Sequence, residues 1–371
     1  MRESNLNSFA RILLSEIMAL WVDKYRPREL SALTYHVKQA RDLIEIVKAG
    51  DFPHLLIYGP NGAGKMTRIF CVLRELYGSG VEKLRMDTRS FQAPSGKKLE
   101  IQTFSSNYHI QLSPGEVGIY DRVVVQEIVK QMAQMHQIAS ATQRNFKVAV
   151  LMEADQLTRD AQNALRRTME KYAQTCRLIL CCDSISKIID PLKSRCLAVR
   201  VAAPSDDDVA KAVRHVCKQE NVSVPESIIA AVVQKANGNM RRALLMIEAA
   251  KVQNYPFKEN QEIPDPEWEV YLRETAKMMM QQQSPENLLK VRNRFYECIG
   301  HCIPPNIIFM KLLHELLKSC NDKVKVEIVA AAAEYEHRLT RGSKPIFHLE
   351  GFAASFMEIY HRHENENAME H

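Results

Sequence analysis

The stretch that decides the fold is HLLIYGPNGAGKMT, residues 54–67. Its apolar beginning, residues 54–58, predicts a short strand buried on both faces. The glycines that follow let the backbone turn its N–H groups inward, and a helix that begins near Lys65 adds the positive end of its dipole. The lysine brings a further positive charge. A strand, a glycine-rich turn, a Gly-Lys pair and a helix in this order predict a loop that holds the phosphates of a nucleotide such as ATP.

Position 66 departs from the usual form of this loop, in which Ser or Thr follows the lysine because that hydroxyl binds Mg²⁺. Met66 stands there instead. Thr67 comes one residue late, about 100° further round the helix, so it does not simply substitute. The residues that we expect to contact the nucleotide in this loop are Gly59, Asn61, Gly62, Ala63, Gly64, Lys65, Met66 and Thr67.

The end of the second predicted strand, at residues 146–152, shows the same departure. In ATPases of this kind an apolar strand ends in an acid that holds Mg²⁺, often followed by a glutamate that activates water. Here these two positions are Met152 and Glu153. Thioethers are poor ligands for a hard cation. Mg²⁺ is therefore doubtful at this site, hydrolysis is expected to be weak or absent, and Glu153 remains at the position of the catalytic base.

The first two-thirds of the chain alternate strand and helix patterns, which predicts an α/β fold with a largely parallel sheet. Further apolar runs at 177–182 and 197–201 predict strands. Residues 121–135 and 158–172 carry apolar side chains at helical spacing. The stretch from 81 to 114 alternates polar and apolar residues, contains turn residues, and resembles a hairpin-like insertion.

After Pro204 the pattern becomes helical. The run Ser205 to Asp208 is a helix-start signal, because a serine cap and carboxylates suit the positive end of a helix. Residues 254–266 are rich in proline and polar residues and suggest a linker, and everything from Glu267 onward has a helical pattern. We therefore expect a small helical domain followed by a C-terminal helical bundle.

The composition limits the classes of protein. The 371 residues are 46% hydrophobic and 25% charged, which is typical of a globular protein of two or three domains. A net charge of +6 permits contact with nucleic acid but does not argue for it. No apolar run approaches the roughly 20 residues that cross a bilayer, so no membrane is expected. The apolar patch near the N-terminus is interrupted by Glu16, which leaves a plain extension or an amphipathic targeting helix open.

The nine cysteines are scattered, and those in the predicted strands suit buried thiols in a reducing compartment. Cys298, His301 and Cys302 lie close enough in sequence to suggest a metal site. No second ligand pair at zinc spacing accompanies them, so we do not expect a metal site there.

Four motifs resemble the small subunits of replication factor C, the eukaryotic sliding-clamp loader, which is built from AAA+ ATPase subunits. They are LWVDKYRP at 20–27, ALRRTMEKY at 164–172, SRC at 194–196 and GNMRR at 238–242. The resemblance covers residues 18 to about 362. It implies an AAA+ P-loop ATPase domain, a small helical lid domain and an all-α collar domain that joins subunits. The expected boundaries are 1–18 for an N-terminal extension, 19–203 for the ATPase domain, 204–256 for the lid, 257–362 for the collar and 363–371 for a disordered tail.

The resemblance also implies roles for single residues. Tyr25, Arg26 and Pro27 would line the adenine pocket. Asp183 would occupy the sensor-one position, where the family usually has Asn, and Arg241 would reach the phosphates from the lid.

Arg195 of the SRC motif would project into the ATP site of a neighbouring subunit as an arginine finger. A finger supplied in trans is worth about 10³–10⁵ in rate. A chain whose own site is degraded could keep this function in full.

The partners implied are four other clamp-loader subunits, the sliding clamp (proliferating cell nuclear antigen) and primer–template DNA, with a nuclear location. Arg122 and Lys130 are candidate phosphate contacts, although Gln126 stands where related subunits carry an arginine. Arg166 and Arg167 suit DNA contact or salt bridges that couple the nucleotide site to neighbours. We expect low DNA affinity for this chain alone.

Two alternative functions remain open from the sequence. An autonomous AAA+ remodeller or helicase would need an intact Mg²⁺ site and a translocating pore loop, which the sequence does not show. A structural scaffold with an empty pocket is opposed by the intact loop and by Arg241.

Overall fold

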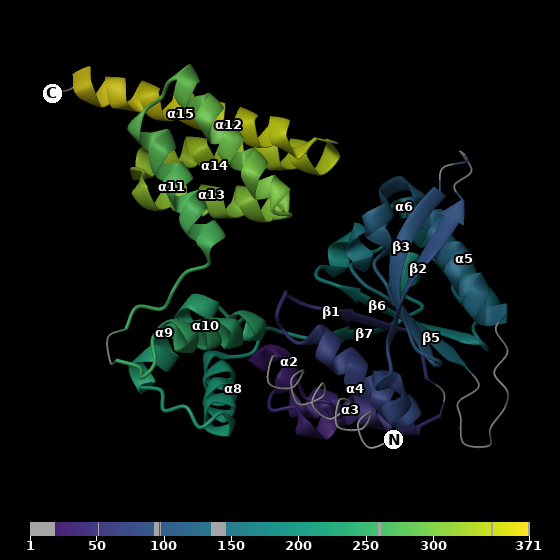
Figure 1. Cartoon of the computed structure of the whole chain (residues 1–371). Helices are drawn as coiled ribbons and strands as arrows, with labels where there is room; N and C mark the ends of the chain where they lie inside the picture. Colours follow the sequence, from purple (N-terminus) through teal and green to yellow (C-terminus); the bar gives the residue numbers. More distant parts are fainter. Residues whose placement is uncertain are drawn as a thin grey trace, which may run out of the picture. The chain divides into compact units, whose positions relative to one another are not determined.

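The computed structural model describes residues 19–50, 52–92, 96, 98–134, 146–258, 261–342 and 344–369. The N-terminal extension that we expected at 1–18 lies outside these residues. The chain divides into two compact units, with the boundary between Ile263 and Pro264, inside the stretch in which we expected a linker (Figure 1).

The first unit is built on a seven-stranded sheet with the order β2-β3-β4-β5-β6-β1-β7. The strands are β1 (Leu55–Tyr58), β2 (Arg85–Gln92), β3 (Lys98–Ser105), β4 (His109–Leu112), β5 (Lys147–Leu151), β6 (Cys176–Cys182) and β7 (Leu197–Arg200). The five strands from β4 to β7 along this order pair in parallel. The four apolar runs that we expected to form strands do so, and the predicted α/β fold is confirmed.

The insertion between residues 81 and 114 forms the other edge of the sheet. β2 and β3 pair as the expected antiparallel hairpin. β4 then pairs antiparallel with β3 and parallel with β5, so the insertion extends the sheet rather than standing apart from it. The side chains of β3 alternate between exposed and buried, as expected for a strand with one solvated face.

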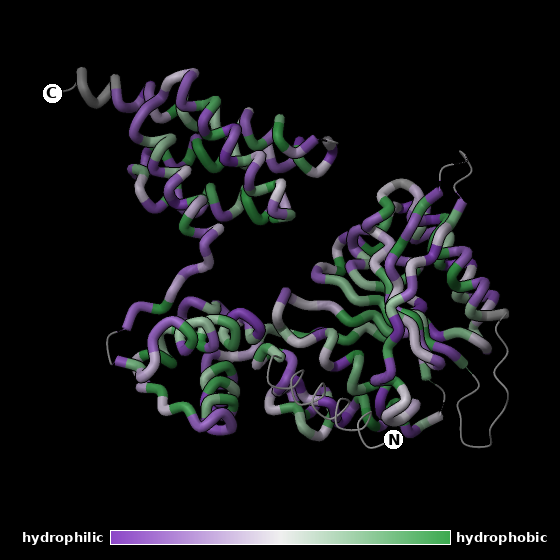
Figure 2. The backbone as a smooth tube through the Cα atoms, in the orientation of Figure 1, coloured by the Kyte–Doolittle hydropathy of each residue, from purple (hydrophilic) through white to green (hydrophobic). Residues whose placement is uncertain are grey.

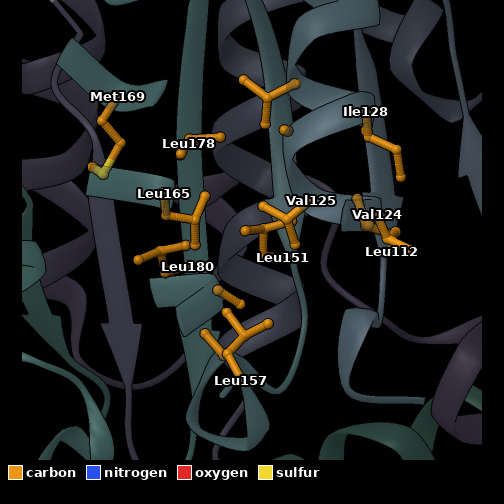
Figure 3. Packing of buried hydrophobic residues seen from close by; sticks show 14 of the residues in the cluster. Leu112, Val124, Val125, Ile128, Leu151, Leu157, Leu165, Met169, Leu178 and Leu180 are labelled. Atoms are coloured by element: carbon orange, nitrogen blue, oxygen red, sulfur yellow. The ribbon is translucent and has the colours of Figure 1, made fainter. Parts of the chain in front are cut away.

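Helices cover both faces of the sheet. The longer ones are α3 (Val37–Lys48) and α4 (Lys65–Tyr77), which share one apolar cluster, and α5 (Asp121–Gln134) and α6 (Arg159–Lys171), which share the other. Successive residues of the central strands enter opposite clusters, which is why these strands are apolar throughout: Ile179 packs with α3 and α4, and Leu180 with α5 and α6. Figure 3 shows the second cluster, in which Leu151 of β5 and Leu180 of β6 pack with Leu165 of α6. Figure 2 shows the hydrophobic residues gathered on these central strands.

Short helical turns connect the main elements. They are α2 (Trp21–Lys24), η1 (Leu30–Ala32), η2 (Gly78–Glu82), η3 (Pro114–Tyr120), η4 (Ala154–Gln156), η5 (Ile185–Lys187) and α7 (Asp190–Lys193). Several of these turns, such as η4 after β5 and η5 after β6, follow the carboxyl ends of strands. Candidate site residues lie at these strand ends.

The small helical domain consists of α8 (Asp206–Gln219), α9 (Glu226–Ala236) and α10 (Met240–Gln253). The predicted helix start is present as a capping box, in which the Ser205 side chain accepts from the Asp208 N–H and the Asp208 side chain accepts from Ser205. Phe257 and Ile263 pack on the core of this domain, so it extends past the boundary at 256 that we expected. We missed these two apolar contacts because the other residues of 254–266 are mostly polar or proline.

The second unit is a bundle of α11 (Glu267–Gln281), α12 (Pro285–Gly300), α13 (Pro305–Ser319), α14 (Asp322–Arg341) and α15 (Pro345–Met369). Its core includes Phe295, Phe309, Phe352 and Phe356, all fully buried. The helix α15 continues through residues 363–369, where we expected a disordered tail. The start of this stretch is anchored, because His363 and the preceding Arg362 both reach Glu327 of α14.

No helix among the described residues is both long and apolar enough to cross a membrane.

Candidate functional site

The predicted strand, loop and helix are present, with the loop between β1 and α4. Gly59, Gly62 and Gly64 have φ angles of 152°, 78° and 85°. A Cβ atom at Gly59 would lie 1.8 Å from the Val201 carbonyl oxygen, and one at Gly62 would lie 1.9 Å from the Asn239 Oδ1. These glycines are therefore required by both backbone conformation and close packing.

Lys65 lies at the start of α4, and its ammonium is engaged on three sides. Its Nζ lies 2.7 Å from the Gly59 carbonyl oxygen, 3.0 Å from that of Pro60 and 2.6 Å from Asp183 Oδ1. The structure thus brings together Lys65 and Asp183, two of the residues that we expected near the nucleotide, and their roles toward a nucleotide stay a prediction. The Asp183 side chain is 60% exposed and that of Lys65 only 10%, so the carboxylate is the partner that an incoming phosphate displaces most easily.

Glu153 follows β5 and has a left-handed backbone, with φ of 49°. Such a conformation is uncommon for residues other than glycine and is found preferentially at functional sites. Partial burial raises the pKa of Glu153, and the nearby carboxylates of Asp155, Asp183 and Glu116 raise it further. The side chain is therefore a stronger base than an ordinary surface glutamate, in a locally acidic environment.

The residues at the two Mg²⁺ positions do not fit this ion. Met66 and Met152 are both half-buried and both pack against the same apolar cluster, the one shared by α3 and α4. Their thioethers pack against apolar side chains. They stand where a hydroxyl and a carboxylate, the oxygen ligands that a hard cation prefers, would be needed. Within the described part of the chain, no group of three or more His, Cys, Asp or Glu side chains could hold a metal ion, the Cys298 region included.

The lid contributes the start of α10. The Asn239 Oδ1 accepts from the Arg242 N–H at 3.0 Å and caps the helix, and the same side chain packs on Gly62 of the loop. Arg241 is exposed in the first turn of α10. The N-terminus of this helix, with Arg241 on it, therefore lies beside the phosphate loop.

The segment with Tyr25, Arg26 and Pro27 runs between the lid and α4. Tyr25 packs on the lid core, and its hydroxyl donates to Glu220. Arg26 pairs with Asp23 at 2.9 Å, and the Pro27 carbonyl accepts from the Cys71 thiol of α4 at 3.4 Å. Their adenine contacts stay a prediction.

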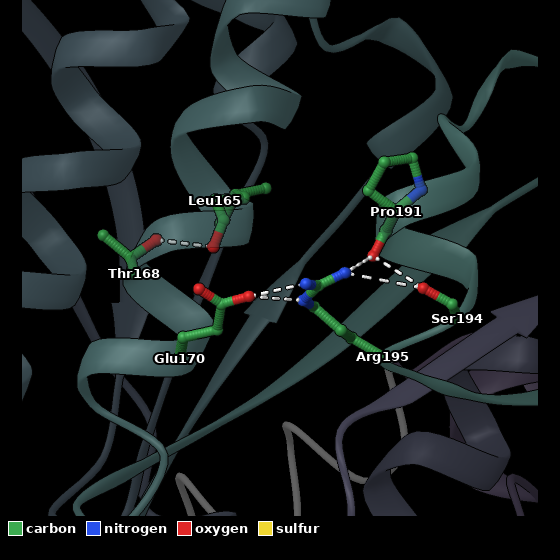
Figure 4. A network of polar contacts seen from close by, with 6 residues as sticks. All are labelled: Leu165, Thr168, Glu170, Pro191, Ser194 and Arg195. Carbon is green, nitrogen blue, oxygen red and sulfur yellow. Dashed lines mark hydrogen bonds and ion pairs between the residues drawn. The ribbon is translucent and has the colours of Figure 1, made fainter.

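Arg195 follows α7 and is held by Glu170 of α6 (Figure 4). Its Nε and Nη2 lie 2.8 Å and 2.6 Å from the same Glu170 oxygen, and its Nη1 donates to the Pro191 carbonyl at 2.8 Å. The side chains of Arg195 and Glu170 are 32% and 54% exposed. The contacts described for Arg195 all lie on α6, on α7 and at Ser194, away from its own phosphate loop.

Three polar residues that support the site escaped the sequence analysis. Gln162 is buried in α6, where its amide N–H groups donate to Leu157 and Lys187 and its oxygen accepts from Ile189, so it anchors the segment leading to Arg195. Arg68 and Tyr35 lie behind the phosphate loop. The one signal available for Arg68 in the sequence was its charge directly before the apolar run at residues 69–73.

The structure also brings together three of the candidate DNA contacts. A cavity of about 350 Å³ between α5 and α6 is lined by Arg122, Gln126, Asp160, Asn163, Ala164, Arg166 and Arg167. Lys130 does not line this cavity. Three arginines against one aspartate make it suited to an anion.

Comparisons with known families cover most of the chain. Residues 35–205 match the family described as DNA polymerase III, delta subunit, and residues 211–252 match the RCF1/5-like AAA+ ATPase lid domain. Residues 268–364 match the C-terminal domain of replication factor C subunit 3.

Individual relatives agree with these matches. The chain is 56% identical to replication factor C subunit 3 of mouse and of human over 343 residues, which are 92% of this chain and 96% of each relative. It is 49% identical to the probable subunit 3 of Dictyostelium discoideum over 93% of this chain and 99% of the relative. Among solved structures, the Thermotoga maritima RuvB branch migration motor is 13% identical, with a TM-score of 0.46 over 67% of this chain and 78% of that one.

Because the phosphate loop, the lid and the helical bundle are all present and relatives of this identity span nearly the whole chain, the chain belongs to the replication factor C family.

Proposed function

We propose that this chain is a nucleotide-binding, weakly hydrolysing subunit of a heteropentameric DNA sliding-clamp loader, which uses ATP to open the clamp and place it on primer–template DNA. Membership of the replication factor C family supports the clamp-loading role. Its partners are then four other clamp-loader subunits, the sliding clamp (proliferating cell nuclear antigen) and DNA, in the nucleus.

One observation supports nucleotide binding with weak hydrolysis at this chain's own site: an intact phosphate loop lies beside two thioethers. Gly59 to Lys65 keep the backbone and the charge that hold ATP or ADP, while Met66 and Met152 lack the oxygen ligands for Mg²⁺. Binding and hydrolysis make different demands, because binding needs the loop and hydrolysis needs transition-state charge stabilisation. The site therefore holds nucleotide and turns it over slowly.

Arg195 carries the catalytic contribution, as an arginine finger in the site of a neighbouring subunit. Its guanidinium is partly exposed, its ion pair with Glu170 is solvated, and Gln162 anchors the segment that presents it. A solvated pair is worth at most about 1 kcal/mol, so little opposes the exchange of Glu170 for a phosphate.

The experiment is an ATPase and clamp-loading assay of the reconstituted complex with Arg195→Ala. We expect the loss of one neighbouring site's hydrolysis, by a factor of about 10³ or more at that site. Lys193→Ala is the matched control, because Lys193 is a partly exposed cation two residues away that pairs with Asp190. A complex with Arg195→Ala that hydrolyses ATP at the normal rate at every site would show that the finger assignment is wrong.

The arginine-lined cavity between α5 and α6 supports a minor DNA contact. Replacing Arg166 or Arg167 should flatten the salt dependence of DNA binding by the complex, by about one unit of slope for each phosphate that the arginine neutralises. An unchanged slope in both variants would assign these arginines to contacts within the assembly instead.

A further inference from the structure

Arg68 is a cation buried inside the first unit. It lies in the first turn of α4, and its side chain is 0% exposed, the largest fully buried side chain among those described. Arginine is almost never fully buried unless it is paired. Arg68 forms no ion pair with a carboxylate that the structure describes, and its Nε has no hydrogen-bond partner there. A buried cation without a counter-ion is costly, so its position needs an explanation.

The partners of the Arg68 guanidinium belong to the phosphate loop and to its support. Nη1 donates to the carbonyl oxygens of Ala63 at 3.3 Å and Gly64 at 3.4 Å, and Nη2 donates to the Tyr35 carbonyl at 3.2 Å. The guanidinium carbon lies 4.7 Å from the centre of the Tyr35 ring, and the Tyr35 hydroxyl donates to the same Ala63 oxygen at 2.9 Å. The charge therefore lies directly against the back of the loop.

These two carbonyls couple the buried charge to the front of the loop. The Ala63 carbonyl belongs to the same peptide group as the Gly64 N–H, and the Gly64 carbonyl to the same group as the Lys65 N–H. In a trans peptide the N–H points away from the C=O. A cation that binds the carbonyl side in a medium of low dielectric polarises the group and makes its N–H a stronger donor on the opposite side.

The geometry points to Arg68 as a positioning residue that gives the phosphate loop a permanent positive charge from behind, so that nucleotide binds here without a divalent cation. This inference rests on the proposed nucleotide-binding function. It also accounts for the thioethers at Met66 and Met152, since a site whose resident cation is a side chain does not need ligands for Mg²⁺.

The test is a titration of the full chain with fluorescent ADP, in Mg²⁺ and in excess EDTA. We expect the wild-type dissociation constant to change less than about threefold between the two conditions. Arg68→Met removes the charge at similar volume and should weaken binding in EDTA by about tenfold or more, because it removes charge-assisted hydrogen bonds from the loop. Arg68→Lys keeps the charge and should recover a large part of this loss.

Two controls separate charge from packing. Arg74→Met removes a partly exposed arginine of the same helix, whose ion pairs are with Glu82 and Glu29, and should bind ADP as the wild type does. Tyr35→Phe removes the other donor to Ala63 but leaves the charge, and should weaken binding by no more than a few-fold. Thermal melts show whether each variant folds. If Arg68→Met does not fold, the wild-type comparison, Arg68→Lys and Tyr35→Phe still decide the question.

The outcomes separate this inference from the function on which it rests. A wild-type chain that binds ADP only with Mg²⁺ overturns the inference and leaves nucleotide binding standing. Equal binding by Arg68→Met and the wild type in EDTA, or an Arg68→Lys variant no better than Arg68→Met, overturns the electrostatic role of Arg68. A wild-type chain that binds no nucleotide in either condition overturns the proposed function as well.

Discussion

The ion pair between Lys65 and Asp183 leads to a prediction about nucleotide affinity. A phosphate that reaches the Lys65 ammonium must replace the Asp183 carboxylate, which lies 2.6 Å from it. Asp183→Asn keeps the shape of the side chain and removes its charge. We therefore expect the variant to bind ADP more tightly than the wild type, because the competing anion is gone.

The size of the effect follows from the exposure of the two partners. Lys65 is nearly buried but the Asp183 side chain is 60% exposed, so solvent screens the pair and its value is at most about 1 kcal/mol. This corresponds to about a fivefold lower dissociation constant. The repulsion between the carboxylate and the phosphates acts in the same direction, and salt weakens both contributions.

The assay is a titration of the full chain with fluorescent ADP at low and high salt. The fivefold gain should appear at low salt and shrink at high salt. Asp322→Asn is the matched control, because Asp322 is also an exposed aspartate in an ion pair, 2.8 Å from Lys325. An Asp183→Asn variant whose ADP binding at low salt is weaker than that of the wild type, or unchanged, would refute this reasoning and indicate that Asp183 supports the nucleotide rather than competing with it.

Three further predictions concern catalysis and stability. Glu170→Gln releases Arg195 from a solvated pair, so hydrolysis at the neighbouring site of the reconstituted complex should rise by up to about fivefold; a fall would mean that Glu170 positions the finger. Burial lowers the pKa of His54 and His109 to about 4, so the stability that comes from their neutral forms is full above pH 6.5 and is lost as the pH falls toward 4. Urea denaturation at pH 7 and pH 5 should show a loss of roughly 1–2 kcal/mol for each histidine, and equal stability at the two values would contradict this. Ser205→Ala removes the capping box of α8 and should cost about 1 kcal/mol in the same measurement, whereas a change within error would show that the box is not needed.

The sequence predicted the parallel part of the sheet well, because its strands are buried on both faces and appear as uninterrupted apolar runs. Residues 146–152 and 177–182 form β5 and β6, and successive residues of each enter opposite apolar clusters. β4 was hidden inside the hairpin-like insertion, because its parallel partner β5 begins 38 residues further along the chain, counted from His109 to Lys147. No local pattern reports a pairing of that range.

Part of the candidate site could likewise be predicted from local sequence. The loop from Gly59 to Lys65 could be recognised from the residues alone, because its glycines, lysine and flanking elements are contiguous and each type meets a local backbone or charge requirement. The absence of oxygen ligands at positions 66 and 152 was equally visible, since each position follows directly from its neighbouring motif.

Only the tertiary structure decided which distant groups each charged side chain contacts. Asp183 on Lys65, Glu170 on Arg195 and Arg68 beneath the loop carbonyls are contacts that depend on how strands and helices are stacked. A sequence determines where a charge can be placed along a helix or after a strand. Whether that charge meets water, a carboxylate or the back of a peptide group depends on packing across the fold, and packing sets the local dielectric and hence the chemistry.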